Sequence, residues 1–384
     1  MKIDTLRIYP IVLPFSSEFS HAMRKRSTVS NVVVEVTADN GAVKGYGEAA
    51  PRSYVTGESQ DSVVRSIRLL VDGGPFPWQL EDVSQIWKFV DSLPNRKEHH
   101  SAVCALELSL LDALGRSRGT SVIDFFSGKH RKDTVRYGAV FPLAAKEKIA
   151  DLSRIAREMK INRVKLKVGN DFQYNSAALK AVQEVYGNEA DLIIDVNMAW
   201  DLETALQHVP LIEECGVRVV EQPMGPGRTT EIAEFCALMA SRNVWVMADE
   251  SVCTRGEARH VFNEGHYTMM HVRLSKCGGL RRSLEMVRRL RLMDVPFAIG
   301  CQLGESGILS AAGRAVSLLC GDASYYNCCY DEFLLKENTT LENVSFGMGG
   351  EAGPLNGPGL GVEVDYESLK RMSAGPVAVV TPGP

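Results

Sequence analysis

The sequence of 384 residues lacks long hydrophobic runs and an excess of charge of either sign. No apolar run approaches the roughly 20 residues that a transmembrane helix needs. A formal net charge of −4 gives no bias toward nucleic acid or an anionic membrane surface. The first residues, Met1–Arg7, include charges where a signal peptide would need an apolar core. We therefore expect a cytoplasmic protein that binds neither nucleic acid nor membranes.

A pairing pattern among the nine cysteines is also absent. They are scattered along the chain, and Cys328 and Cys329 are adjacent. Because disulfides are rare in reducing compartments, the favoured interpretation is that these are buried free thiols. The composition, 45% hydrophobic and 23% charged, is ordinary for a globular protein, and the length predicts two lobes.

A repeat of strand-like and helix-like segments occupies residues 131–345. Its units recur at about 25 to 29 residues, which suits one strand, one helix and two short loops. Eight units in succession predict a closed parallel barrel. The alternative, an open doubly wound sheet, would usually carry a glycine-rich phosphate turn after its first strand, and residues 138–142 do not resemble one. The predicted strands begin near Val135, Val164, Leu192, Val217, Val244, Met269, Pro296 and Tyr325.

The segments before and after this repeat do not show its alternation of strand and helix. Residues 5–13 and 29–37 predict strands, and residues 101–115 predict a helix with an apolar face. We therefore expect an α+β domain over residues 1–130. The C-terminal segment, residues 346–384, begins with a glycine-rich connector, and its tail is expected to pack back on the first domain.

Charged residues stand at the C-terminal ends of five consecutive predicted strands, the second to the sixth. Active sites of (β/α)-barrels lie at those ends. An unpaired charge in such a buried place costs several kcal/mol, so these charges persist where they neutralise one another around a metal. In strand order they are Lys165 with Lys167, then Asp195, Glu221, Asp249 and finally Lys276.

Three carboxylates from adjacent strands, Asp195, Glu221 and Asp249, offer hard oxygen ligands. Such a set suits Mg²⁺, which favours octahedral oxygen coordination. Zinc would more often recruit histidine or cysteine, and neither stands at these three positions. The alternative is that the carboxylates only form ion pairs with the neighbouring lysines.

Two of the lysines, Lys165 and Lys167, are two residues apart on a strand and therefore share a face. Two close ammonium groups are expected to lower the pKa of at least one, which makes a competent general base. A solvated pair on an edge strand is the alternative, and the flanking residues Val164, Leu166 and Val168 disfavour it. Lys276 is expected across the barrel mouth. Two bases on opposite faces of one carbon suit racemisation or acid/base addition and elimination.

The Lys-x-Lys strand, the acidic series and Lys276 resemble the muconate-lactonizing subgroup of the enolase superfamily. Residues 45–49 (Gly-Tyr-Gly-Glu-Ala), 105–113 and 357–361 (Gly-Pro-Gly-Leu-Gly) also resemble its signatures. The mandelate racemase subgroup would place a histidine at the end of the seventh strand, where this chain has Ile299–Gln302. The resemblance implies an α/β fold: a modified (β/α)7β TIM-type barrel with an α+β N-terminal capping domain. It also implies homo-oligomers.

The resemblance further assigns roles, with Mg²⁺ as the cofactor and a small carboxylate as the substrate. It makes Lys167 the base on one face, Lys165 its electrostatic partner and Lys276 the acid or base opposite. The proton is removed alpha to the carboxylate through an enediolate. The implied metal ligands are Asp195, Glu221 and Asp249, with Asn197 and Glu250 in support.

Signals for the rest of the substrate are weaker. Tyr54 begins a stretch, residues 54–59, that resembles branches acting on amino-acid derivatives, including dipeptide epimerases. Those epimerases carry an Asp-x-Asp pair at the eighth strand, whereas this chain has Cys-Cys-Tyr-Asp-Glu at residues 328–332. Asp331 or Glu332 could reach a cationic group, or both could be exposed loop carboxylates.

Two further residues each have two interpretations. Arg24 lies among three consecutive basic residues, which either attract an anionic substrate or form a solvated loop. Glu305 either lines the pocket or is an acid at a helix N-terminus, where the helix dipole favours it.

Three functions remain open at this point. The leading hypothesis is an isomerase, either a racemase or epimerase or a cycloisomerase, with an amino-acid derivative as a candidate substrate. The second is a lyase, a dehydratase acting on a β-hydroxy carboxylate with the same lysines. The third is a non-catalytic binding protein, which would predict decay among the charged strand ends, yet none of the six is replaced.

Overall fold

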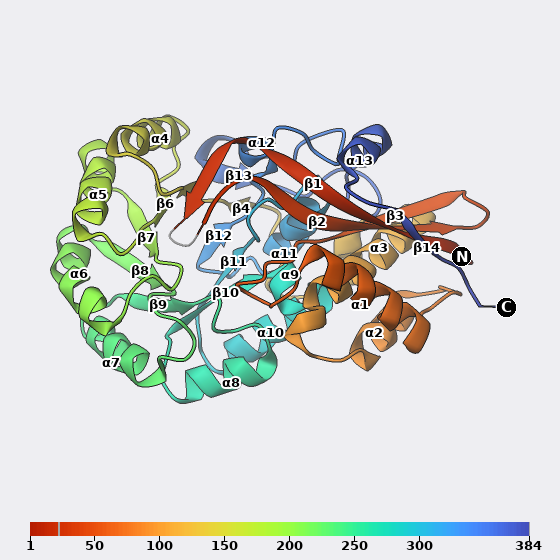
Figure 1. Ribbon diagram of the computed structural model, residues 1–384, viewed down its shortest axis with the longest axis horizontal. Coiled ribbons are helices and arrows are strands. Elements are labelled where there is room, and N and C mark those ends of the chain that lie inside the picture. The colour runs from red at the N-terminus through yellow and green to blue at the C-terminus, as the bar shows by residue number, and fades with distance from the viewer. Residues whose placement is uncertain (22–23, 384) are drawn as a thin grey trace.

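The computed structural model describes residues 1–21 and 24–383, with side chains described outside residues 17–26. Its centre is a sheet of eight parallel strands in sequence order. The backbone N–H of Gly138 donates to the carbonyl of Tyr326 at 2.9 Å, which joins the first strand to the last. This closure confirms a barrel and makes the open doubly wound sheet wrong (Figure 1). The strands are β5 (Ala139–Phe141), β6 (Arg163–Lys167), β7 (Asp191–Asp195), β8 (Val217–Glu221), β9 (Trp245–Ala248), β10 (Met269–Arg273), β11 (Phe297–Gly300) and β12 (Tyr325–Asn327).

The first predicted barrel strand is displaced along the chain. The pair β4 (Val135–Arg136) lies outside the barrel, because it bonds antiparallel to β13 (Glu351–Ala352). The barrel begins three residues after this pair, at Ala139, which aligns with Val164 of β6.

Helices cover the outside of the barrel between successive strands (Figure 1). Side chains cap the N-termini of some of these helices: in α8 the Thr254 hydroxyl accepts from the Glu257 N–H, while the Glu257 carboxylate accepts from the Thr254 N–H. The helix that directly follows β12 is only the four-residue α12 (Asp331–Leu334). The others are α4 (Lys146–Glu158), α5 (Phe172–Tyr186), α6 (Leu202–Glu214), α7 (Thr229–Ala240), α8 (Arg255–Asn263), α9 (Leu274–Cys277), α10 (Leu280–Leu292) and α11 (Gly307–Leu319).

An antiparallel sheet with helices on it forms the capping domain. Helix α3 packs directly on β3, since a Cβ added at Gly47 would lie 2.1 Å from the carbonyl oxygen of Ala105. The prediction of a single apolar face therefore underestimates the burial of α3, which is buried on all sides along most of its length. The elements are β1 (Ile3–His21), β2 (Arg24–Ala38), β3 (Val43–Ala49), α1 (Gln60–Gly73), α2 (Val83–Ser92), α3 (His100–Arg118) and the short turns η1 (Lys97–His99) and η2 (Val122–Phe125).

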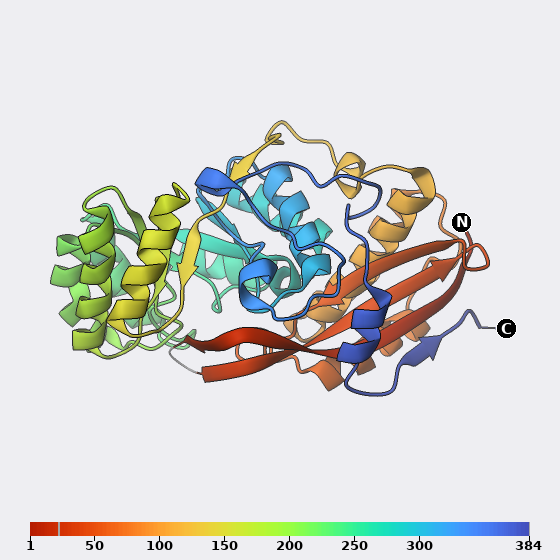
Figure 2. The ribbon, with the colours of Figure 1, turned by 90° about the horizontal axis from the view of Figure 1, so that it is seen from above.

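The C-terminal segment returns to the N-terminal sheet. After η3 (Met348–Gly350) and α13 (Tyr366–Met372), strand β14 (Ala378–Val380) pairs antiparallel with β1 (Figure 2). The divisions at residues 130 and 345 stay a prediction. None of the described helices has the length and apolar character needed to cross a bilayer.

Candidate active site

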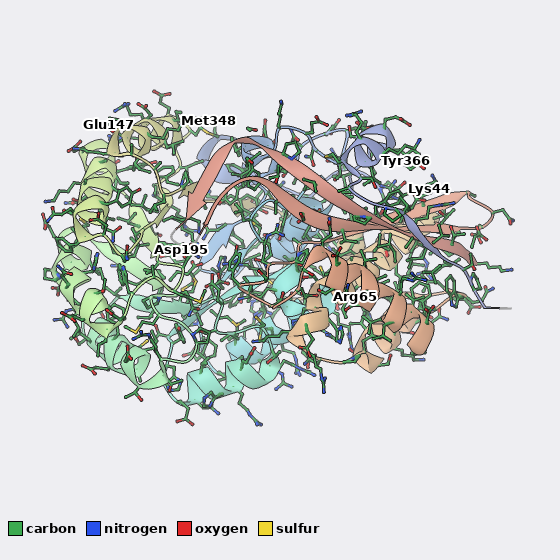
Figure 3. The ribbon with its side chains drawn as sticks, viewed as in Figure 1. Lys44, Arg65, Glu147, Asp195, Met348 and Tyr366 are labelled. Carbon is green, nitrogen blue, oxygen red and sulfur yellow. The ribbon has the colours of Figure 1, made fainter. Side chains whose placement is uncertain are left out.

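The predicted charged residues converge at one end of the barrel. Lys165 and Lys167 come from β6, Asp195 from the end of β7 and Glu221 from the end of β8. Asp249 directly follows β9. Figure 3 places Asp195 inside the ring of barrel strands. The predicted edge-strand alternative for the lysines is wrong, because β6 lies between β5 and β7.

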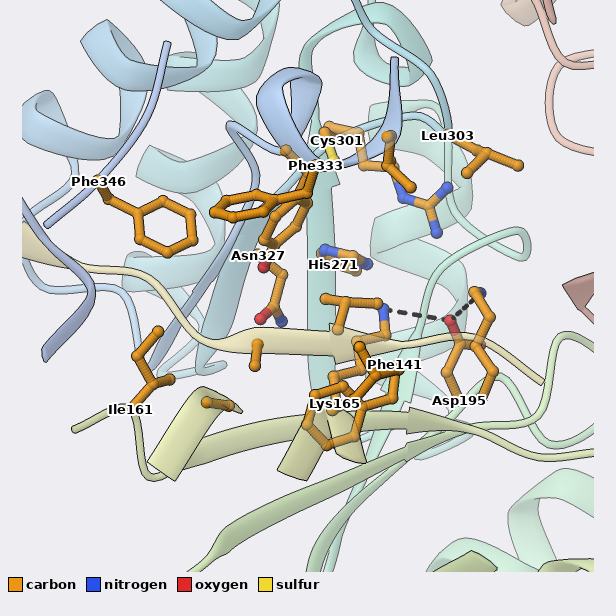
Figure 4. A pocket seen from close by; sticks show the side chains of 18 of the residues that line it. Phe141, Ile161, Lys165, Asp195, His271, Cys301, Leu303, Asn327, Phe333 and Phe346 are labelled. Atoms are coloured by element: carbon orange, nitrogen blue, oxygen red, sulfur yellow. Dashed lines mark hydrogen bonds and ion pairs between the residues drawn. The ribbon is translucent and has the colours of Figure 1, made fainter. Parts of the chain in front are cut away.

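The two lysines of β6 share one carboxylate. Lys165 Nζ lies 3.2 Å and Lys167 Nζ 2.8 Å from Asp195 Oδ2 (Figure 4). Lys165 also donates to Glu221 at 2.7 Å, and Lys167 to the Asn197 side-chain oxygen at 2.8 Å. The ion pairs that the sequence left as an alternative are thus present.

The electrostatics of Lys165 differ from the prediction. Burial lowers the pKa of Lys165, but the nearby charges of Asp195 and Glu221 raise it more, so that it ends above its ordinary value. Lys165 is therefore not the lysine with the lowered pKa that was expected for at least one of the two, and that expectation stays a prediction. Lys165 is suited to remain a cation.

Lys276 is not on the sixth strand. Strand β10 ends at Arg273, and Lys276 lies in the short helix α9 that follows. This helical turn directs Lys276 Nζ back to Asp249, 3.0 Å from Oδ1 and 2.9 Å from the backbone oxygen. Lys276 is completely buried, and burial is the first cause of the lowered pKa of its ammonium group.

Glu221 and Asp249 group with a residue that the sequence analysis missed, His271. Ligand atoms of these three side chains lie within 4.8 Å of one another. Glu221 Oε2 is buried without a hydrogen-bond partner among the described residues, as a carboxylate oxygen reserved for a cation would be. The donor set therefore fits a divalent metal. Asp195 bonds the two lysines of β6 instead, and its role as a ligand stays a prediction.

The alternation of β10 could have identified this histidine. Met269 fills the barrel interior, so His271 and Arg273 share that face. His271 Nδ1 lies 3.0 Å from Glu221, and Arg273 contacts Asp249 and donates to Gln302 at 2.9 Å. Arg273 thus adds one cation beside the buried acids, whereas burial lowers the pKa of His271 and favours its neutral form.

The two predicted supporting residues contact each other. The Asn197 amide donates to Glu250 at 3.2 Å. Burial first, and then the charges of Asp195 and Glu221, raise the pKa of Glu250 to about 7. Glu250 is therefore suited to carry a proton near neutral pH.

A pocket of about 200 Å³ opens from Lys165, Lys167 and Asp195, and Tyr54 contributes to its lining. Glu305 is outside the set of described residues that line it: its carboxylate is buried and accepts the Gln302 N–H at 2.7 Å. Its substrate contact stays a prediction, as does that of Arg24, whose side chain lies outside the described residues.

The two acids after the eighth strand are also outside the described lining. Asp331 is buried and accepts hydrogen bonds from the Val344 N–H and the Asn338 amide, whereas Glu332 is exposed. Asp331 stabilises its own loop, and the interpretation that both acids are exposed loop carboxylates is wrong for this residue.

Comparisons with known proteins agree with this architecture. Muconate cycloisomerase 1 of Rhodococcus opacus is 28% identical over 351 residues, covering 89% of this chain and 91% of that enzyme. The crystal structure of N-succinyl Arg/Lys racemase from Bacillus cereus has a TM-score of 0.87 at 22% identity, covering 99% of this chain and 100% of that one. A dipeptide epimerase from Enterococcus faecalis, complexed with Mg and the dipeptide L-Leu-L-Tyr, has a TM-score of 0.83 at 20% identity, covering 94% and 100%.

The family model described as Enolase C-terminal domain-like matches residues 148–369, more than half of the chain. The chain therefore belongs to the enolase superfamily, in the group that includes the muconate-lactonizing enzymes.

Proposed function

We propose that this protein is a Mg²⁺-dependent isomerase, a racemase or epimerase or a cycloisomerase, acting on a small carboxylate. The observation that carries the proposal is the convergence of Lys167 and Lys276 on one buried cluster of carboxylates. Relatives named racemase, epimerase and cycloisomerase support an isomerase over a dehydratase. The complete set of charged side chains argues against a non-catalytic binding protein.

Glu221 and Asp249, with Asp195 or His271, would hold the Mg²⁺. The bound ion supplies positive charge beside the substrate carboxylate as negative charge develops there. Lys167 Nζ takes the alpha proton from one face, and Lys276 Nζ delivers a proton to the other. Lys165 stays charged beside the developing anion, and Asn197 holds Lys167 in place through its 2.8 Å contact.

The burial of both lysines supports proton exchange without bulk water. Lys276 has no exposed surface, and Lys167 is 13% exposed. A low-dielectric surrounding strengthens their interaction with a developing carboxylate charge. An amino-acid derivative is the substrate class that the racemase and epimerase relatives favour. A cytoplasmic location and a homo-oligomeric state complete the proposal.

Deuterium exchange at the alpha carbon tests the function. The enzyme with Mg²⁺ in D₂O is screened against N-acyl amino acids, dipeptides and lactones by mass spectrometry. Wash-in of deuterium without loss of water supports an isomerase, whereas a 2-keto or unsaturated product would indicate the lyase.

Separate K167A and K276A variants should abolish turnover while Mg²⁺ binding, measured by calorimetry, is retained. K180A, which removes an exposed lysine of α5 that pairs with Glu214 at 3.8 Å, is the matched control. Normal turnover by either active-site variant would contradict the assignment of two bases.

A further inference from the structure

The pocket has two chemically different ends. One end contains the lysines of β6 and Asp195. From there it extends along β5 into an arm lined by aromatic and aliphatic side chains (Figure 4). The residues that form this apolar arm are Ile155, Met159, Tyr330, Phe333 and Phe346.

The arm exists because the helix that directly follows β12, α12, has only four residues. The four-residue α12 leaves the side of α4 uncovered, and Phe333 and Phe346 pack there with ring centroids 5.6 Å apart. Ile155 on α4 is 54% exposed and Phe333 is 50% exposed. Contact between exposed apolar side chains and water is unfavourable. An apolar ligand that covers these side chains would therefore bind favourably.

A polar group stands between the arm and the lysines. Asn327, at the end of β12, is 5% exposed and lines the pocket. Its side-chain nitrogen has no hydrogen-bond partner among the described residues. An unpaired buried amide N–H is costly, so a ligand oxygen that accepts from it would be bound selectively. In Figure 4 Asn327 lies between Phe346 and Lys165.

The charge of the arm also restricts its occupant. Asp195 is the one acid among the described residues that line the pocket, and it bonds both lysines. Asp331 and Glu332, which lie between Tyr330 and Phe333 in the sequence, are both outside the described lining: Asp331 Oδ2 accepts from the Val344 N–H and the Asn338 amide, and Glu332 is exposed at the surface. An ammonium group in the arm would therefore be desolvated without a carboxylate partner.

We propose that the substrate is a carboxylic acid acylated with a neutral apolar group, whose tail fills the apolar arm and whose acyl carbonyl accepts from Asn327. This inference rests on the proposed function and adds to it the class of the distal group. An N-acyl amino acid with an aryl or branched alkyl tail meets both requirements. A free dipeptide does not, because its ammonium group would lie at the entrance to the arm.

Three probes separate these requirements. N-phenylpropanoyl-alanine has the carbonyl and the apolar tail, N-acetyl-alanine has only the carbonyl, and phenylalanyl-alanine adds an ammonium group to the first. Burial of a phenyl ring predicts that kcat/KM for alpha-proton exchange is about tenfold or more higher for the first probe than for either other. Equal or higher values for N-acetyl-alanine or for the dipeptide would overturn the proposal.

Substitutions locate the effect. I155E places a charge in the arm at an exposed helical position and should reduce kcat/KM for N-phenylpropanoyl-alanine about tenfold, with no change for N-acetyl-alanine. L292E is the matched control, since Leu292 is 76% exposed on α10 and outside the pocket. N327L should lower kcat/KM roughly fivefold for both acylated probes, because both lose the same hydrogen bond. An I155E variant that affects both acylated probes equally would contradict an arm that binds the tail.

A binding measurement distinguishes this proposal from the proposed function. If none of the probes exchanges its alpha proton, the isomerase activity on these acids fails, and the rise in Tm with N-phenylpropanoyl-alanine becomes the test. A rise that I155E removes and L292E retains supports the arm. No rise, or a rise that I155E retains, overturns it. Exchange of all three probes at one rate leaves the isomerase intact and overturns the arm.

Discussion

The imidazole Nδ1 of His100 lies 2.6 Å from the carbonyl oxygen of Lys276. His100 begins α3 of the capping domain, and Lys276 is the buried lysine of α9 in the barrel. A second contact joins the same two elements, from Ser101 Oγ to Ser275 Oγ at 3.1 Å. Glu58 in turn accepts from the Ser101 N–H at 3.0 Å. The capping domain thus holds the turn that carries one proposed base.

The first prediction concerns the protonation of His100. Burial lowers the pKa of His100 to about 4. The unfolded chain binds a proton below about pH 6.5, whereas the folded protein does not until about pH 4, so acid destabilises the fold across this window. Between pH 6.5 and 4, the free energy of unfolding of H100N should fall by about 3 kcal/mol less than that of the native protein. Urea unfolding at both pH values measures it.

H260N, at an exposed position of α8, is the control for removing a histidine. If the native protein and H100N lose the same stability over this range, His100 is not the cause of the loss.

The second prediction has the opposite sign and concerns Glu107. Burial raises the pKa of this carboxyl to about 7, although hydrogen bonds from backbone N–H groups of α10 act to lower it. The folded protein therefore holds a proton that the unfolded chain loses above about pH 4.5, and stability falls as the pH rises to 7. E107Q should be more stable than the native protein at pH 8 by up to about 3 kcal/mol. The two should be alike at pH 4.5.

Thermal unfolding across this range measures the effect. E234Q, on the surface helix α7, should show the native pH dependence. If the native protein and E107Q are equally stable at pH 8, burial does not disfavour the ionised form of Glu107.

The third prediction tests the position of His271. A Cβ added at Gly300 would lie 1.7 Å from His271 Nε2. G300A should therefore displace the imidazole from its 3.0 Å contact with Glu221 and destabilise the protein by about 1–3 kcal/mol. Turnover and Mg²⁺ affinity should fall together. G128A is the matched control, since no atom lies within 4 Å of its added Cβ, and native Mg²⁺ affinity in G300A would separate His271 from the metal site.

The fourth prediction concerns metal removal. Mg²⁺ that binds only the folded state should stabilise it by about 2.7 kcal/mol at a concentration 100 times Kd. Chelation should lower Tm accordingly and abolish proton exchange, and both should recover with added Mg²⁺. E221Q should lose the Mg²⁺-dependent rise in Tm, whereas E214Q, an exposed acid of α6, should keep it. A rise that persists in E221Q would place the metal elsewhere.

The sequence by itself determined the barrel and most of the charged cluster. A regular spacing of strand-like runs specifies βα units, and charges at matched strand ends are too costly to bury unless they meet. This inference uses only the sequence around each strand end. It therefore correctly placed Lys165, Lys167, Asp195, Glu221 and Asp249 in one cluster.

Only the tertiary structure decided the contacts between distant segments. The pKa of Lys165 depends on which carboxylates lie beside it, and the position of Lys276 depends on a helical turn after β10. The contact between His100 and Lys276 joins residues 176 positions apart. The apolar arm forms because α4 and the segment after β12 face each other beside α12, a helix of only four residues. Strand periodicity specifies which residues share a face, but packing between elements decides which faces meet and what they leave open.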